Sequence, residues 1–261
     1  MFQVAVLASG SKGNSIVIRT EKAKILLDAG LSGNKILSTL HSLNLDEGKL
    51  DAVVISHEHL DHIRGAGIIC RRLKIPLYIT EQTYTISIRK LGNLPTGVRY
   101  FSIGESFRIK DIIINPFSSS HNAVDCSNFI FQKESDLERK LAVVIDVGFI
   151  SRLMLFNIKN STTIILESNH DEKMLIEGPY SWDLKQRVKS RHGHLSNKQA
   201  VKLIENVVHF GLKNLVLAHL SEINNTQEIA KSQMEKFLKR INHKLNLVIA
   251  SQYKPTKLLD I

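Results

Sequence analysis

Hydrophobic residues in the first half of the chain fall into short runs that are separated by turn residues. Runs of about four to eight residues that are rich in β-branched side chains predict strands. The predicted strands cover residues 2–8, 15–20, 24–28, 51–56, 76–80, 98–103 and 106–115. Segments with a helical pattern lie between some of these runs, and Ser32 precedes the first of them as a helix cap. The predicted helices cover residues 32–43, 63–73 and 81–91.

The second half begins with a predicted hairpin and continues with alternating helices and strands. Residues 128–132 and 141–146 form the hairpin, and the charged segment 133–140 is predicted as its solvated loop. Further strands are predicted at 162–167, 214–218 and 245–250, and helices at 171–177, 181–190, 197–210 and 226–241. A meander followed by such alternation predicts an α/β fold in which two mixed sheets lie face to face with helices outside, a four-layer αββα sandwich.

Composition predicts a single globular domain over residues 1–261. The hydrophobic fraction of 43% and the charged fraction of 23% are ordinary, and no Pro-rich or Ser-rich linker divides the chain. Cys70 and Cys126 lack CxxC spacing, so we expect two small core residues and a reducing cytoplasm rather than a disulfide framework. The first residues lack a basic, signal-like region, and no apolar run approaches the roughly 20 residues of a membrane span.

The net charge of +10 favours polyanions as partners. Nucleic acid, phosphorylated metabolites and anionic lipid all satisfy that preference. A generally basic proteome explains the charge equally well. The charge therefore needs support from specific residues.

The run His57-Glu58-His59-Leu60-Asp61-His62 follows the predicted strand 51–56 directly. His57 and His59 are two residues apart at a strand end, so their side chains lie on one side and can bind one metal ion. Asp61 and His62 follow where the chain enters a helix and can bind a second ion. Imidazole and carboxylate ligands suit Zn²⁺, with Mn²⁺ or Fe²⁺ as alternatives.

Two metal ions need more ligands than this run supplies. His121, Asp146 and His219 each follow a predicted strand or apolar segment. Open α/β sheets place their ligands at the carboxyl ends of strands. These three residues are therefore the candidates that complete the site.

At these residues the chain resembles the metallo-β-lactamase fold hydrolases along nearly its whole length. Five family motifs occur in order, and they are Asp28, the His57–His62 run, His121, Asp146 and His219. Within that superfamily the chain resembles the WalJ/YycJ/VicX group of bacterial proteins. The segments typical of the group cover residues 7–15, 167–171, 193–197, 217–221 and 224–225. The resemblance implies the αββα sandwich that the pattern also predicts.

The resemblance also implies the role of each site residue. One ion would be held by His57, His59, His121 and Asp146, and the other by Asp61, His62, Asp146 and His219. Asp146 would bridge the two, and Asp61 counts among the catalytic residues as well. Asp28 would lie beneath the site and orient a ligand, with Glu167 and His170 as further supports. This chain departs from the family at Asn122, where Asp is frequent, and at residues 125–128, where a Pro-Gly turn is common.

Two such ions would generate a hydroxide that attacks a phosphodiester, a thioester or an amide. Phosphodiester is favoured by the net charge and by the basic segment 185–191, although on charge pattern alone a solvated helix face is the simpler explanation of that segment. The turn 193–197 opens a helix, so Ser196 and nearby backbone N–H groups are predicted to hold a phosphate oxygen. His194 is predicted to protonate the leaving alkoxide. Lys12 and Asn14 are further predicted phosphate contacts, with a plain β-turn as the alternative.

The sequence therefore predicts a metal-dependent nuclease, and the resemblance implies a DNA 5′-to-3′ exonuclease. DNA is favoured over RNA, partly because no β-CASP-type insertion or long tRNA-binding arm occurs. A thioesterase like glyoxalase II and a regulatory partner without catalysis are the two alternatives. Exo- versus endonucleolytic cleavage, the native metal and the oligomeric state stay open at this stage.

Overall fold

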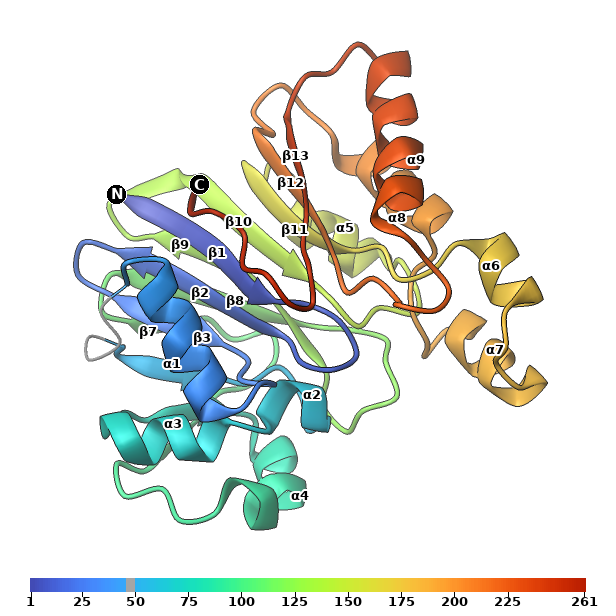
Figure 1. The fold of residues 1–261 in the computed structure, drawn as a ribbon. Coiled ribbons are helices and arrows are strands. Elements are labelled where there is room, and N and C mark those ends of the chain that lie inside the picture. Colours follow the sequence, from blue (N-terminus) through green and yellow to red (C-terminus); the bar gives the residue numbers. More distant parts are fainter. Residues whose placement is uncertain (46–49) are drawn as a thin grey trace.

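The computed structural model describes residues 1–45 and 50–261, which form two seven-stranded sheets packed face to face (Figure 1). The first sheet has the order β14-β1-β2-β3-β4-β5-β6 and the second has the order β13-β12-β11-β10-β9-β8-β7. The strands of the first sheet are β1 (Phe2–Ala8), β2 (Ser15–Thr20), β3 (Lys24–Leu27), β4 (Ala52–Val54), β5 (Leu77–Ile79), β6 (Val98–Tyr100) and β14 (Leu259–Asp260). The strands of the second are β7 (Phe107–Ile109), β8 (Ile112–Ser118), β9 (Ser127–Lys133), β10 (Asp136–Val144), β11 (Thr163–Glu167), β12 (Asn214–Ala218) and β13 (Asn246–Ile249).

Central strands carry hydrophobic residues at several consecutive positions because both faces of each sheet are covered. In β1, Val4 and Val6 face the core between the sheets, whereas Ala5 and Leu7 pack toward the outer helices. The same alternation occurs in β12, where Val216 joins the core between the sheets. This double burial explains why the strands read as continuous apolar runs in the sequence.

Helices cover the outer face of each sheet, so the four-layer αββα prediction is confirmed (Figure 1). On the first sheet lie α1 (Gly33–Ser42) and α3 (Ala66–Leu73), with α2 (Leu60–Ile63) and α4 (Glu81–Leu91) near them. On the second lie α5 (Arg152–Ile158), α8 (Asn197–Val207) and α9 (Gln227–Arg240), whereas α6 (Glu172–Glu177) and α7 (Trp182–Lys189) lie apart. No helix in the described ranges has the length and apolar character to cross a membrane.

The parallel parts of the two sheets position the site. Strands β3 to β6 run parallel to one another, and so do β10 to β13. Their carboxyl ends therefore emerge along one edge of each sheet. The segments that follow β3, β4, β10, β11 and β12 carry the polar residues singled out in the sequence.

The structure corrects four details of the predicted elements. Segment 133–140 is not a loop, because β10 begins at Asp136 and its exposed end pairs with Lys133 of β9. Ladder hydrogen bonds hold that end, so it needs no apolar side chains. Predicted strand 106–115 is a hairpin of β7 and β8, and β14 was missed. Predicted helix 63–73 breaks at Gly65, whose N–H bonds the Ala29 carbonyl instead of the preceding turn.

Candidate metal centre

Strand ends from both sheets bring the predicted ligands together around Asp146. The Oδ2 atom of Asp146 lies 2.8 Å from Nε2 of His62 and 3.9 Å from Nε2 of His57. Its Oδ1 atom lies 3.9 Å from Nε2 of His121. His57 follows β4 of the first sheet and Asp146 follows β10 of the second, so the centre lies where the two sheets meet.

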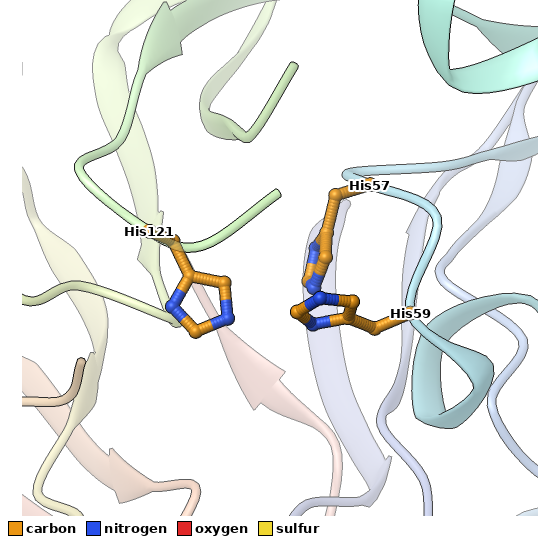
Figure 2. Close-up of side chains that lie close together, drawn as sticks. All are labelled: His57, His59 and His121. Atoms are coloured by element: carbon orange, nitrogen blue, oxygen red, sulfur yellow. The ribbon is translucent and has the colours of Figure 1, made fainter. Parts of the chain in front are cut away.

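Three imidazoles form the first cluster, which consists of His57, His59 and His121 (Figure 2). The ring centroids of His57 and His59 are 4.6 Å apart, and that of His121 lies 5.1 Å from His59. One nitrogen from each ring lies within 4.8 Å of the others. Figure 2 shows the rings converging on a common space from two separate loops.

The second cluster consists of Asp61, His62 and His219. Oδ2 of Asp61 lies 3.6 Å from Nε2 of His62 and 3.9 Å from Nε2 of His219. Asp146 contacts this cluster as well, since its Oδ1 atom lies 3.2 Å from Nδ1 of His219. The carboxylate of Asp146 is therefore shared between both clusters.

Each candidate ligand imidazole has its outer ring nitrogen against an oxygen, and its other nitrogen faces the centre, where that of His62 already lies 2.8 Å from Asp146 Oδ2. These outer contacts join His57 Nδ1 to Ser56 Oγ, His59 Nε2 to the Asn122 carbonyl, His62 Nδ1 to Asp28, His121 Nδ1 to the Gly193 carbonyl, and His219 Nδ1 to Glu167. Such contacts fix the tautomer and orientation of metal-binding histidines. The inner Nε2 atoms of His57 and His219 are buried without a hydrogen-bond partner among the described residues. Unpaired buried nitrogens are costly, so the donor set fits divalent metal ions.

The two clusters differ in how they hold protons. Burial, reinforced by the nearby His62, lowers the pKa of His57 well below its ordinary value, and burial also lowers the pKa of His121. Burial acts the same way on His62, but Asp28 and Asp146 outweigh it and raise the pKa of His62 well above its usual range. Asp146 and Glu167 likewise raise the pKa of His219 to about 9 against the effect of burial.

Two buried carboxylates, Asp28 and Glu167, contact the candidate ligands from outside the centre. Asp28 accepts a hydrogen bond from the Ser56 amide at 2.8 Å through Oδ1 and lies 2.8 Å from His62 Nδ1 through Oδ2. Glu167 lies 2.8 Å from Nδ1 of both His194 and His219 through Oε1. Its Oε2 atom accepts the amides of Val147 and Leu195. Because it contacts both His194 and His219, Glu167 links a candidate metal ligand to the candidate proton donor.

Backbone conformation at the site carries strain that the sequence did not indicate. Asp28, Asp146 and His219 have φ values of 58°, 57° and 53°, in the left-handed region that side chains other than glycine rarely adopt. Each of these three residues follows the end of a strand, and the turn at that point directs its side chain toward the centre. Strained backbone of this kind concentrates at functional sites.

Several predicted contacts have other roles in the structure. Ser196 is buried, and its hydroxyl accepts the Gln199 amide in a capping box of α8, so it does not face the site. Lys12 is exposed and its Nζ pairs with Glu222 and Tyr253. Asn14 is buried beneath the second cluster, where its Nδ2 lies 3.0 Å from His62 Nε2 and 3.3 Å from Asp61 Oδ2.

His170 is buried and contacts none of the metal-binding side chains through a hydrogen bond among the described residues. Burial lowers its pKa to about 4. Cys70 and Cys126 are free and buried, which confirms their prediction as core residues. Glu58, not singled out from the sequence, accepts the Val124 amide at 3.0 Å and so holds the loop whose Asn122 carbonyl meets His59.

A cavity of about 390 Å³ opens in front of the two clusters. Asp61, His121, His194 and His219 line it, together with Asn122, the residue where the chain departs from the resembled family. Its remaining lining includes part of α7, from the basic segment of the sequence. Only Arg187 of that segment's Lys and Arg residues lines the cavity in the described structure.

Comparison with solved structures and family models defines the class. The metallo-β-lactamase fold protein YhfI from Bacillus subtilis superposes with a TM-score of 0.75 over 98% of this chain and 100% of its own, at 17% sequence identity. The sequence model of the metallo-beta-lactamase superfamily matches residues 8–117, which include the His57–His62 run. Fold and ligand set thus define a metallo-β-lactamase fold protein.

Relatives that match nearly the whole chain define the family within this class. Exodeoxyribonuclease YycJ of Bacillus anthracis is 36% identical over 235 residues, covering 90% of this chain and 88% of the relative. Exodeoxyribonuclease WalJ of Streptococcus pneumoniae is 37% identical over 236 residues, covering 89% and 87%. The chain belongs to the metallo-beta-lactamase superfamily and, within it, to the family that includes YycJ and WalJ.

Proposed function

We propose that this protein is a metal-dependent DNA exonuclease that degrades its substrate in the 5′-to-3′ direction. The observation that carries the proposal is the complete donor set around Asp146 in a chain that is similar to two exodeoxyribonucleases over nearly its whole length. The net charge of +10 suits a polyanionic substrate. The direction of degradation and the choice of DNA over RNA belong to the proposal.

The proposed metal is Zn²⁺, with Mn²⁺ and Fe²⁺ as alternatives, because imidazole and carboxylate donors suit all three ions. His57, His59, His121 and Asp146 would hold one ion, and Asp61, His62, Asp146 and His219 the other. When bound, such a pair acidifies water and neutralises the charge of an attacked phosphodiester. The two buried free cysteines fit a reducing compartment, so the proposed location is the cytoplasm.

The proposed role of His194 is to protonate the leaving alkoxide. Its Nδ1 atom is held 2.8 Å from Glu167, so Nε2 is the nitrogen that is left for the substrate in the cavity. Burial alone would raise the pKa of Glu167, but the positive charge and hydrogen bonds of His194 and His219 lower it to about 2. Glu167 therefore stays ionised, and its hydrogen bond with Nδ1 of His194 orients that ring for the proposed proton transfer.

The test is cleavage of DNA and RNA of one sequence, single-stranded and duplex, labelled at either end, with Zn²⁺ or Mn²⁺. We expect stepwise release of mononucleotides from the 5′ end of DNA. Removal of an outer partner of a metal ligand typically lowers activity about 10- to 100-fold. His59→Ala removes a proposed ligand itself, so its cleavage rate should fall by more than that. The matched control is His41→Ala, which changes an exposed histidine on α1.

Equal cleavage by His59→Ala, or none by the native protein, would contradict the proposal. Turnover of a glutathione thioester without DNA cleavage would favour a thioesterase. Metal content near zero by elemental analysis, together with no turnover of any substrate, would favour a regulatory partner without catalysis.

A further inference from the structure

The segment that contains α6 and α7 (residues 172–189) projects from the two sheets beside the metal centre. Strand β11 ends at Glu167 and β12 begins only at Asn214, and α6 and α7 project beyond the ends of the sheets in Figure 1. Helix α7 has no buried residue. It is held to α6 by a hydrogen bond from Lys185 Nζ to the Ile176 carbonyl. A helix without core contacts contributes little to folding stability, so its sequence is free to serve another purpose.

One face of this segment forms a wall of the cavity. Leu184, Arg187 and Val188 line it from α7, and Tyr180 lines it from the turn before the helix. The three helical residues have the i, i+3, i+4 spacing that places side chains on one face. The lining also includes imidazole and carboxylate groups of the metal centre, among them His121, Asp61 and Asp146. The cavity therefore combines apolar and aromatic groups from this segment with the ionic groups of the centre.

The Tyr180 and Arg187 side chains on this wall have no hydrogen-bonding or ionic partner in the part of the chain that the structure describes. Neither the Tyr180 hydroxyl nor the Arg187 guanidinium makes a hydrogen bond or ion pair with a described residue, and the Tyr180 ring stacks on no other aromatic ring there. Neighbouring cations are engaged differently. Arg191 lies 4.0 Å from the centroid of the Phe149 ring, and Lys185 is bonded to α6. Tyr180 and Arg187 are therefore the polar side chains of this wall that are available to a ligand.

We propose that this wall binds one unpaired nucleotide of the substrate strand, an inference that rests on the proposed function. Tyr180 stacks on the base, Leu184 and Val188 contact the sugar and base edge, and Arg187 pairs with a neighbouring phosphate. An aromatic ring stacks only on a base whose face is free, so the preferred substrate is a single-stranded or frayed end. The arrangement has no hydrogen-bond pattern for a particular base and predicts little sequence preference.

The first test compares Tyr180→Ala with Trp182→Ala. Trp182 is an aromatic residue that begins α7, is 68% exposed and does not line the cavity. We measure the Kd of a labelled single-stranded oligonucleotide by fluorescence anisotropy and KM by cleavage. Base–aromatic stacking is worth about 1–3 kcal/mol, so Tyr180→Ala should raise both constants about tenfold. Trp182→Ala should change them less than about twofold, and Tyr180→Phe should bind like the native protein.

An oligonucleotide with one abasic nucleotide near its 5′ end makes the assignment specific. The native protein should bind it about tenfold more weakly than the intact strand, whereas Tyr180→Ala should bind both strands equally. Additive losses from the variant and the abasic site would overturn the stacking assignment. So would equal losses in Tyr180→Ala and Trp182→Ala.

The second test addresses Arg187 through salt dependence. A phosphate contact releases counterions, so Arg187→Gln should reduce the slope of log Kd against log salt by about 0.7. Lys189→Gln removes the same charge from the same helix outside the cavity and should leave the slope unchanged. Equal slopes in the two variants would overturn the Arg187 assignment. Because binding is measured separately from cleavage, failure of the proposed function leaves a distinct signature, namely binding without turnover.

Discussion

Glu167 has four hydrogen-bonding contacts that glutamine cannot all replace. Its Oε1 atom lies 2.8 Å from the Nδ1 atoms of His194 and His219, and its Oε2 atom accepts the Val147 and Leu195 amides at 2.9 and 3.1 Å. In Glu167→Gln one oxygen becomes an NH₂ donor. If that NH₂ points at the N–H groups of Val147 and Leu195, hydrogen-bond donors face one another in the buried interior and neither has an acceptor. If it meets the imidazoles, their Nδ1 atoms must accept and their Nε2 atoms must carry the protons.

Either orientation weakens the centre. Two charge-assisted hydrogen bonds are lost, each worth about 1.5–3 kcal/mol, so we expect the metal-free variant to be less stable by about 3 kcal/mol or more. A protonated Nε2 on His219 cannot bind a metal, so metal affinity should fall about 10- to 100-fold. Competition with a chromophoric chelator measures the affinity, and urea unfolding measures the stability.

The matched control is Glu172→Gln, which alters a neighbouring carboxylate that pairs with Lys198 and contacts Ser196 outside the cavity. It should leave metal affinity unchanged. The reasoning is refuted if Glu167→Gln binds metal within about twofold of the native protein, since the outer contact would then not control the ligand.

Two further changes test the packing and the titration near the centre. A Cβ on Gly30 would lie 1.6 Å from the Asp61 carbonyl oxygen. Gly30→Ala should therefore lower the free energy of unfolding in urea by about 1–3 kcal/mol or more and weaken metal binding. The control is Gly97→Ala, whose Cβ meets nothing within 4 Å and which should retain full metal affinity. His170 has a pKa of about 4 in the fold, so between pH 6.5 and 4 the unfolded chain binds a proton there that the folded protein does not. Stability should therefore fall over that window by about 3 kcal/mol more in the native protein than in His170→Gln, and parallel pH profiles of the two proteins would contradict this.

The candidate ligands could be singled out in the sequence, and their convergence expected, because each follows a strand whose apolar run is easy to recognise. His57, Asp146 and His219 each follow an apolar run that both sheet faces bury, and their residue types are rare at such places unless they bind something. Resemblance to a known family then supplied Asp28 as the outer partner of a ligand. The layer order followed from the same apolar runs.

The rest depended on information that local pattern does not hold. A capping box and a phosphate-binding helix start share one sequence, so Ser196 could not be assigned until its hydroxyl was seen bonded to Gln199. Helix α7 has no buried face, so nothing in its periodicity shows that Arg187 turns toward the cavity. The left-handed backbone of Asp146 could not be predicted either, because glycine is the residue whose presence indicates that conformation in a sequence.

The contrast in pKa between the two clusters has a thermodynamic consequence for loading. His57 and His121 are neutral near pH 7 and can accept an ion without losing protons, whereas His62 and His219 retain protons that an ion must displace. Occupation of the second cluster is therefore the more strongly pH-dependent of the two. Titration calorimetry in buffers of different ionisation enthalpy would distinguish metal binding at the two clusters. Only binding at the second cluster should release protons and so give a heat that depends on the buffer. We therefore expect the second cluster to lose its ion at a higher pH than the first as the medium acidifies.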